Sequence, residues 1–291
     1  MNRIHHLLSD NWAIQRHALT NLMALIMPGL TTGNISGISD YFSRSTCQVQ
    51  AYNPYLAEYY EACHADLPNN SVLVFNLSGP LYSWMSESLA WKLRSIYDNS
   101  KICGVVLVID GPGGMVSHID QAVAAIRDCP KPTAAVVTGC MASAHFWLGT
   151  SCDKTYVVSP LCEVGSVGII YTHSNFRDYF KQQGIDYREI YPGTADLKNE
   201  EIRALIDKDD ESLIKTKAER VHRIFAEDVA KNLDIPYNPE LPLFRGRMFP
   251  GDEAVSLGYI DEMGTVEDAA RWVLGQSVSR KANSIIDDLD N

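Results

Sequence analysis

The sequence predicts an α/β protein in which βαβ units build a mostly parallel sheet. From residue 71 onward, short apolar runs alternate with stretches whose apolar residues recur at helical spacing, which is the pattern of such units. One run, residues 104–109 (Gly-Val-Val-Leu-Val-Ile), carries no polar side chain and is typical of a strand that is covered on both faces.

The expected elements follow in a regular order. Strands are predicted over residues 72–77, 104–109, 133–138, 155–158 and 166–170, and helices over 83–97, 117–127 and 144–151. Apolar residues at helical spacing among charges between Asn199 and Leu233 predict one long helix or two in sequence.

Composition divides the chain into three parts. Residues 1–65 are expected to form an N-terminal arm that is partly helical, with one or two short helices between Leu7 and Met27 and another over 52–62. Residues 66–275 contain the regular alternation and form the expected main domain. Residues 276–291 are expected to be a polar, frayed tail.

The composition also excludes classes of protein. With 291 residues, 46% of them hydrophobic and 21% charged, the chain can bury a sizeable core and is not disordered over most of its length. A formal net charge of -11 argues against a general nucleic-acid binder, which needs a basic surface to neutralise phosphates.

Cysteine usage and hydropathy bear on the compartment. The seven cysteines form no C-x-x-C pair and several lie in apolar runs, which indicates reduced thiols in a cytosol-like compartment. The longest early apolar run, Leu22–Met27, is far shorter than the ~20 residues that a bilayer requires. We therefore expect a cytoplasmic protein with no membrane anchor and no secretory signal.

Since the metal-binding His-Glu-x-x-His motif is absent and the cysteines lack ligand spacing, neither a metal nor a cofactor is expected.

Three segments that follow predicted strands carry residues suited to chemistry. In the first, Asp110–Met115 (Asp-Gly-Pro-Gly-Gly-Met), glycines let the backbone approach a ligand and point N–H groups at it. The segment lacks the Lys-Ser/Thr of a P-loop and the third glycine of a dinucleotide fingerprint. Taken alone, a tight turn is the simpler explanation.

The second segment, Thr138–His145, contains Ser143 where a strand is expected to turn into a helix. A hydroxyl at such a turn suits a nucleophile, because the next backbone amide can bind a developing oxyanion. An ordinary helix N-cap is the alternative. The third segment, Glu163–Ile170, places small residues at a strand entry, which indicates close approach of another group or simply tight packing.

Together, in this order and spacing, the three segments resemble the signal peptide peptidase A/protease IV family of serine peptidases, which includes the bacteriophage prohead (capsid maturation) proteases. The resemblance covers roughly residues 71–274 and closes with segments 247–254 and 257–264. Asn11–Ile14 is also similar to the start of phage-type members. The resemblance implies the Clp-protease/crotonase-like fold with a long C-terminal helix, and a serine peptidase domain over 66–275.

The resemblance also implies roles for five residues. Ser143 matches the nucleophile, the amides of Gly114 and Ala144 match the oxyanion hole, Lys198 matches the general base, and Ser166 matches the hydroxyl that orients the lysine.

Two positions depart from the family pattern. The family usually has glycines after the nucleophile, where this chain has Ala144 and His145, so His145 is expected to add bulk near the substrate path. The family's lysine also stands closer to its preceding glycine than Lys198 does to Gly193.

The identity of the base leaves two alternatives. A lysine serves only when neutral, and burial in an apolar groove would have to lower its pKa by ~2 to 3 units from about 10.4. His173, which follows the predicted strand 166–170, is the alternative base, because Ser-His-Asp is the commoner arrangement.

The expected function is a serine endopeptidase with a Ser-Lys dyad, of the phage prohead-protease type. The implied partners are protein or peptide substrates (capsid, portal or scaffold chains and its own termini) and further copies of the chain in a homo-oligomer. A phage-encoded protein would act in the host cytoplasm or the prohead. The alternatives are an assembly or scaffolding protein that retains the fold without activity, a signal-peptide-degrading peptidase, and a crotonase-type acyl-CoA enzyme, which would need neither Ser143 nor Lys198.

Overall fold

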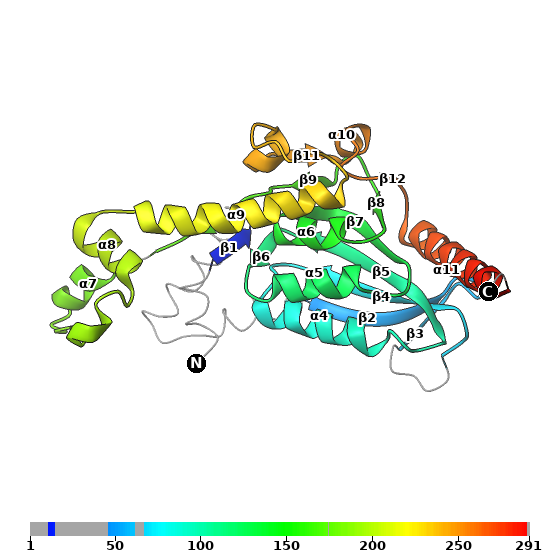
Figure 1. Ribbon diagram of the computed structural model, residues 1–291, viewed down its shortest axis with the longest axis horizontal. Helices are drawn as coiled ribbons and strands as arrows, with labels where there is room; N and C mark the ends of the chain where they lie inside the picture. The colour runs from blue at the N-terminus through cyan, green and yellow to red at the C-terminus, as the bar shows by residue number, and fades with distance from the viewer. Residues whose placement is uncertain (1–10, 15–45, 62–66, 174, 290–291) are drawn as a thin grey trace.

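The computed structural model describes residues 11–14, 46–61, 67–173 and 175–289, and a large central sheet dominates it (Figure 1). Within these residues the sheet has nine strands, with the path β11-β9-β7-β5-β4-β2-β3, while β8 pairs with β7 and β12 with β8. The strands are β2 (Thr46–Asn53), β3 (Glu58–Glu61), β4 (Ser71–Ser78), β5 (Ile102–Gly111), β7 (Thr133–Ala142), β8 (Lys154–Val157), β9 (Glu163–Gly165), β11 (Met248–Pro250) and β12 (Glu262–Met263).

The middle of the sheet is parallel, as is the outer pair of β8 and β12, while the outer strands β2, β3 and β11 pair antiparallel. β5 pairs in parallel with β4 and with β7, and β7 pairs in parallel with β8 and β9. β2 runs antiparallel to β4, and β11 runs antiparallel to β9. The sheet is open, and the predicted α/β class with a mostly parallel sheet is confirmed.

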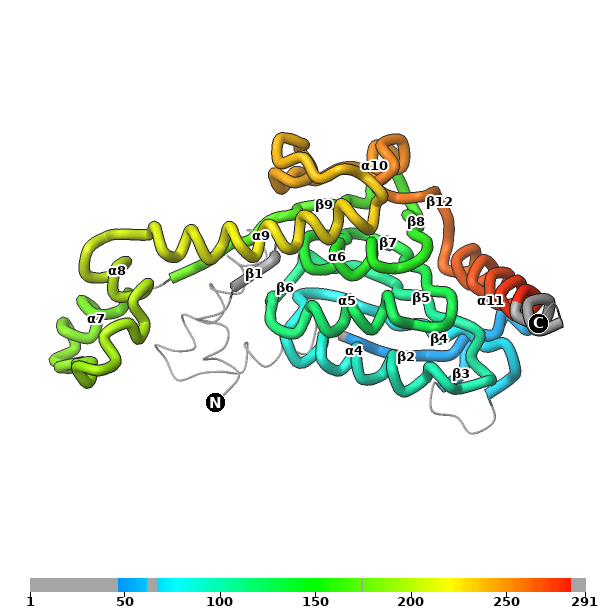
Figure 2. Tube along the Cα trace, viewed as in Figure 1, coloured from blue at the N-terminus to red at the C-terminus, as the bar shows by residue number. Residues whose placement is uncertain are grey.

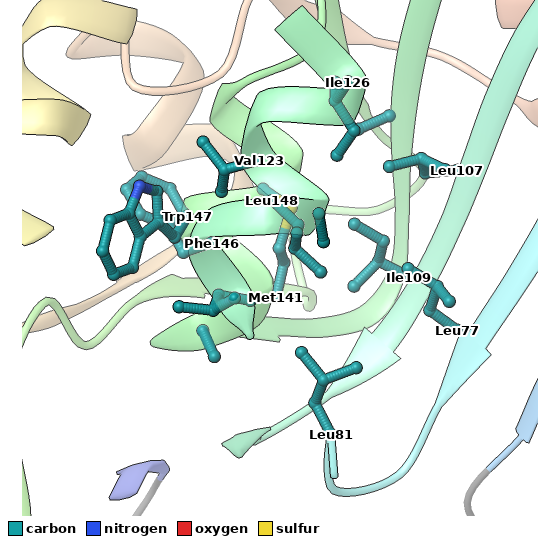
Figure 3. Close-up of a cluster of buried hydrophobic side chains, with 14 of the residues drawn as sticks. Leu77, Leu81, Leu107, Ile109, Val123, Ile126, Met141, Phe146, Trp147 and Leu148 are labelled. Carbon is teal, nitrogen blue, oxygen red and sulfur yellow. The ribbon is translucent and has the colours of Figure 1, made fainter. Parts of the chain in front are cut away.

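One face of the sheet is covered by α4 (Ser83–Ser95), α5 (Ile119–Arg127) and α6 (Ala144–Thr150). Every residue of α6 is buried, so this short helix lies inside the core rather than on its surface. Figure 3 shows Phe146 and Leu148 of α6 among side chains of β5 and α5, including Ile109 and Val123. The burial of α6 fixes the position of the residue that precedes it, Ser143.

The other face of the sheet is covered by α11 (Val266–Leu289). Gly104 on β5 makes this close packing possible, since a Cβ there would lie 2.2 Å from Cγ1 of Val273. Ala269 and Ala270, both fully buried, present small side chains to the sheet and let the helix backbone approach it.

A long helix, α9 (Ser212–Asn232), crosses over α6 and carries an arm away from the sheet (Figures 1 and 2). Near its C-terminal end, Phe225 stacks on Trp147 of α6 with ring centroids 4.7 Å apart, and Asp228 accepts a 2.5 Å hydrogen bond from the Trp147 indole. The arm at the other end comprises α7 (Arg177–Gln182), the 3₁₀ turn Gly193–Ala195 and α8 (Glu200–Lys208). The predicted stretch 199–233 is therefore two helices, α8 and α9.

A second, smaller sheet lies beside the central one. Its strands, in the order β10-β1-β6, are β10 (Ile170–Tyr171), β1 (Asn11–Ile14) and β6 (Gly113–Met115), with β1 antiparallel to both neighbours. A short 3₁₀ turn, Pro242–Arg245, and helix α10 (Gly251–Ser256) complete the described elements.

Two expectations for the N-terminal arm are wrong. The helix expected over 52–62 is absent from the described part of this stretch, because β2 and β3 form a hairpin there whose turn is held by the Asn53 side chain, which accepts hydrogen bonds from the amides of Tyr55 and Leu56. Residues 11–14, expected in a helix, form strand β1. The other residues of the helices expected between Leu7 and Met27 lie outside the described residues, and the division of the chain at 65 and 275 stays a prediction.

Two further boundaries differ from expectation. The strand predicted over 166–170 is wrong except at its last residue, since β9 ends at Gly165 and β10 begins at Ile170. Ser166, directly after β9, has φ 57°, which does not continue an extended strand. The expected frayed tail from residue 276 is wrong, since α11 continues as a helix to Leu289. In the part of the chain that the structure covers, no helix combines the length and apolar character needed to cross a bilayer.

Candidate active site

The three segments singled out in the sequence converge where β5, β7 and β9 end. At the end of β7, Met141 is in register with Gly111 of β5 and with Val164 of β9. The next pair in register is Ala142 with Gly165, so Ser143 and Ser166 each follow the end of one of two adjacent parallel strands. The carboxyl ends of neighbouring parallel strands are a common location for sites in α/β proteins.

Ser143 lies in a strained turn that its neighbours hold in place. Its backbone angles, φ 55° and ψ -116°, lie outside the regions that non-glycine residues favour, at a cost on the order of 1–3 kcal/mol. The Ser143 amide donates to the Gly165 carbonyl (2.8 Å), and the Ser143 carbonyl accepts from the Trp147 amide (3.0 Å). Strain of this kind persists only where surrounding contacts determine the conformation, and it is concentrated at functional sites.

The hydroxyl of Ser143 does not act as a helix cap. Ser143 occupies the N-cap position of α6, yet its side chain makes no capping hydrogen bond to the helix. The Oγ atom instead lies 3.4 Å from the carbonyl oxygen of Gly168, in the segment between β9 and β10. Ala144 is the first residue of α6, where a backbone amide has no partner within the helix. This geometry disfavours the N-cap alternative and leaves the hydroxyl and the next amide beside each other.

The glycine turn after β5 is fixed by Leu81. The Leu81 amide donates to the Gly113 carbonyl and the Met115 amide donates to the Leu81 carbonyl, both at 2.8 Å. A Cβ on Gly114 would lie 1.9 Å from the Leu81 carbonyl oxygen, so only glycine fits at this position. Because amides alternate along a strand, the Gly114 amide points away from Leu81. The turn therefore presents the Gly114 amide on the side away from Leu81, where β1 pairs with β6.

His145 does not lie in the substrate path, so the expectation that it adds bulk there is wrong. The side chain is fully buried, and its Nδ1 accepts a 3.1 Å hydrogen bond from the Gly113 amide. A Cβ on Gly111 would lie 2.3 Å from the ring, which shows how closely the histidine packs beneath the turn. Burial lowers the pKa of His145 to about 4, so the ring is neutral near pH 7. His145 thus connects α6 to the glycine turn as a hydrogen-bond acceptor.

Ser166, like Ser143, has a positive φ angle. Its φ is 57°, and its amide donates to the Arg247 carbonyl at 3.0 Å. The preceding Gly165 has φ 118°, and a Cβ there would lie 2.5 Å from the same carbonyl oxygen, so β11 holds this turn as Leu81 holds the other. Ser166 is half-buried beside the site.

Lys198 is not brought to Ser143 within one chain. It lies between the 3₁₀ turn Gly193–Ala195 and α8, on the arm at the far end of α9 from α6 (Figures 1 and 2). The side chain is exposed, so the apolar burial that would neutralise a lysine is lacking in the single chain. His173, the alternative base, is also exposed, just after β10, and partial burial lowers its pKa.

Asp110 and Cys140 complete the surroundings. Asp110, for which the sequence predicted no role of its own, accepts a 3.0 Å hydrogen bond from the Cys140 amide and lies against Gly139, where a Cβ would be 2.5 Å from its Oδ1. Its carboxylate therefore joins the ends of β5 and β7. Burial, with the charges of Glu163 and Asp110, raises the pKa of the Cys140 thiol to about 12, so the thiol is protonated. The sequence signal for the role of Asp110 in joining β5 to β7 was its position directly before Gly-Pro-Gly-Gly.

A serine at a strained strand-to-helix turn, next to a glycine turn, is an arrangement that suits nucleophilic chemistry. The chain belongs to peptidase family S49, whose model matches residues 125–277, more than half of its length. The matched range includes Ser143, Ser166 and Lys198, and Gly114 lies before it.

Relatives of the chain include cellular and phage proteins. It is 23% identical to Protease 4 of Haemophilus influenzae over 236 residues, which cover 77% of this chain and 37% of that protein. It is 25% identical to Capsid assembly protease C of Escherichia phage lambda (69% of this chain, 48% of that protein) and 26% identical to Head-tail preconnector protein GP5 of Enterobacteria phage P21 (70% and 41%). The chain thus spans less than half the length of each of these relatives.

Proposed function

We propose that the chain is a serine endopeptidase with a Ser-Lys dyad, in which Ser143 is the nucleophile and Lys198 the general base. The observation that carries the proposal is the state of Ser143: its backbone is strained, its hydroxyl makes no capping bond, and it lies beside the glycine turn. Membership of peptidase family S49 supports the reaction class.

The proposed reaction uses each of the five residues. Ser143 Oγ attacks the carbonyl carbon of a substrate peptide bond while the neutral Lys198 amine takes the hydroxyl proton. The carbonyl oxygen becomes an oxyanion and accepts hydrogen bonds from the amides of Gly114 and Ala144. When the C–N bond breaks, the lysine returns the proton to the leaving amine, and water then hydrolyses the acyl-serine ester. Ser166 orients the lysine amine by a hydrogen bond.

The dyad requires a second copy of the chain, because the arm holds Lys198 away from Ser143 of the same chain (Figure 1). The arm carries five exposed large hydrophobic side chains, which is typical of a surface that a partner covers: Tyr179, Ile185, Tyr187, Ile190 and Leu197. A homo-oligomer in which the arm of one copy delivers Lys198 to Ser143 of the next would bury these residues. It would also remove the lysine side chain from water.

Complementation between two inactive variants tests this arrangement. Ser143→Ala and Lys198→Ala chains are each expected to be inactive on casein and, when mixed and allowed to exchange, to regain part of the wild-type rate. The matched control is Lys181→Ala, which removes another exposed lysine from the same arm and should keep full activity. A mixture that stays inactive, while size-exclusion chromatography finds both variants in common oligomers, would contradict the delivery of Lys198 by a neighbour.

The substrates we propose are protein chains of phage head assembly, which would place the protein in the host cytoplasm or the prohead. The support is that two relatives are named a capsid assembly protease and a head-tail preconnector protein. Incubating the purified chain with capsid, portal and scaffold proteins of its own phage, followed by mass spectrometry, tests this. Cleavage of none of them under conditions in which casein is cut would refute it.

A second candidate function is an assembly protein that retains the fold without activity. The exposure of Lys198, away from Ser143, favours it. A fluorophosphonate probe separates the two candidates, because it reacts with an activated serine. Labelling of the wild-type chain that is lost in Ser143→Ala supports the peptidase, whereas a folded, oligomeric chain that is not labelled supports the assembly protein.

A further inference from the structure

Strand β1 lies between two strands that both belong to the candidate active site. On one side it pairs antiparallel with β6, with Trp12 opposite Met115, Ala13 opposite Gly114 and Ile14 opposite Gly113. On the other side it pairs antiparallel with β10, with Asn11 opposite Tyr171 and Trp12 opposite Ile170. Figure 1 shows β1, in dark blue, beside β6 and apart from the central sheet.

Each neighbour of β1 is continuous with a segment that touches Ser143 or its helix. β6 is the glycine turn itself, and its Gly113 amide donates to His145 of α6. β10 begins two residues after Gly168, whose carbonyl oxygen is the partner of Ser143 Oγ. The slot between β6 and β10 is therefore the place beside Ser143 where an extended peptide could pair on both edges, and residues 11–14 fill it.

The register aligns β1 with the amide that the mechanism needs. The Gly113 carbonyl and the Met115 amide are both bonded to Leu81, so the Gly114 amide between them points to the opposite side, toward β1. Ala13 is the residue in register with Gly114. The backbone of β1 and the oxyanion of a substrate therefore compete for the same side of Gly114.

We propose that residues 11–14 act as a substrate-like strand of the chain itself, which occupies the peptide slot and must leave before another polypeptide can enter. The inference rests on the proposed function in one respect: the peptidase activity is what makes the slot a substrate site. Strand addition is held by main-chain hydrogen bonds, so one extended segment can replace another in it. A tethered segment competes at an effective concentration on the order of millimolar, and a free substrate below that level is at a disadvantage.

Binding of a synthetic peptide tests the proposal without any need for catalysis. The probe is a fluorescent peptide of residues 8–17, and the protein is the full chain carrying Ser143→Ala, so that the peptide stays intact. In this background Ala13→Pro is expected to release the slot, because β1 is paired on both sides and proline is excluded from such strands. Ala13→Ser keeps the backbone amide and is the matched control.

We expect the Ala13→Pro chain to bind the peptide about tenfold more tightly than either the Ala13→Ser chain or the unaltered Ser143→Ala chain. A peptide that itself carries Ala13→Pro should not bind to any of them. A chain that lacks residues 1–14 is the second variant and should match Ala13→Pro. Equal peptide affinity in all of these chains, or no binding to a folded chain without residues 1–14, would overturn the inference.

Activity measurements separate this inference from the proposed function. With Ser143 restored, Ala13→Pro should lower KM for casein about tenfold and leave kcat unchanged, because β1 competes with binding and not with chemistry. A chain that is inactive in every form but whose Ala13→Pro variant still binds the peptide more tightly would refute the peptidase and support the occupied slot.

Discussion

The backbone amide of Ser143 donates a hydrogen bond to the carbonyl oxygen of Gly165, and the two atoms are 2.8 Å apart. This bond extends the parallel pairing of β7 and β9 by one step beyond Ala142 and Gly165, which are the last residues in register. The chain turns away from the sheet at Ser143, whose amide is held by this hydrogen bond. The strained backbone angles of the turn are therefore the φ and ψ of Ser143 itself. The strain has a measurable consequence.

Replacing Ser143 by glycine should stabilise the protein relative to replacing it by alanine. Both variants remove the hydroxyl and should be inactive, but glycine adopts φ 55°, ψ -116° without the steric cost that alanine has there. We expect the glycine variant to be more stable by about 1 kcal/mol, measured as the free energy of unfolding in urea. An alanine variant as stable as the glycine variant would show that the turn relaxes once the hydroxyl is gone.

The buried His145 should make stability depend on pH. Burial lowers its pKa from 6.5 in the unfolded chain to about 4 in the folded one, so the folded state favours the neutral ring. The contribution is complete above about pH 6.5 and is lost as the pH falls toward about 4, with a magnitude on the order of 3 kcal/mol. Urea unfolding at a series of pH values measures it.

Two substitutions isolate the contribution of this histidine. In His145→Asn the amide oxygen can still accept the Gly113 N–H, but nothing titrates, so the slope between about pH 6.5 and 4 should become flatter. His118→Asn alters an exposed histidine and should leave the slope unchanged. An equally steep slope in His145→Asn and the wild type would assign the pH dependence to other groups.

Alkylation of cysteines should leave activity intact. The pKa of Cys140 is raised to about 12, and burial also raises the pKa of Cys103 and Cys162, so few thiolates exist near neutral pH. After treatment of the native protein with iodoacetamide, casein cleavage should be unchanged. Activity lost in step with modification of Cys140, followed by peptide mass spectrometry, would reopen a thiol mechanism.

Substitution of Lys198 should abolish activity, whereas substitution of His173 should not. Lys198→Ala should abolish acylation of Ser143, and Lys198→Arg should fail as well, because a guanidinium does not lose its proton near neutral pH. His173→Ala should retain nearly full activity, since we propose the lysine and not this histidine as the base. Labelling of Ser143 by a fluorophosphonate probe, which phosphonylates an activated serine, measures each variant. An active Lys198→Ala enzyme together with an inactive His173→Ala enzyme would replace the dyad by a histidine mechanism.

The central sheet and the three segments of the candidate site could be predicted because their signals are local. The apolar strands carry continuous or alternating patterns, and glycine and serine at strand ends mark positions with unusual backbone angles, as Gly113 (φ 101°) and Ser166 (φ 57°) confirm. The expected order of the segments corresponds to the order of β5, β7 and β9 in the sheet, since parallel strands bring their carboxyl ends to one edge.

The features that sequence reasoning missed depend on contacts far along the chain. β1 is a strand because β6 and β10, more than ninety residues away, supply its partners, and four residues carry no periodicity that could reveal this. The burial of His145 follows from the burial of all of α6, which a single histidine does not indicate. The position of Lys198 depends on where α9 begins and points, and nothing in the residues around Lys198 indicates that direction.

Helix α9 also has mechanical consequences. Its 21 residues form a rod about 30 Å long that is clamped near one end, where Asp228 holds the Trp147 indole and the Arg127 guanidinium. A rotation of about five degrees at this contact moves the free end of the helix by ~3 Å. A displacement of that size is large enough to break a hydrogen bond made by a residue on the arm. The position of the arm relative to a second molecule therefore depends on how Phe225 packs against Trp147, at the opposite end of α9.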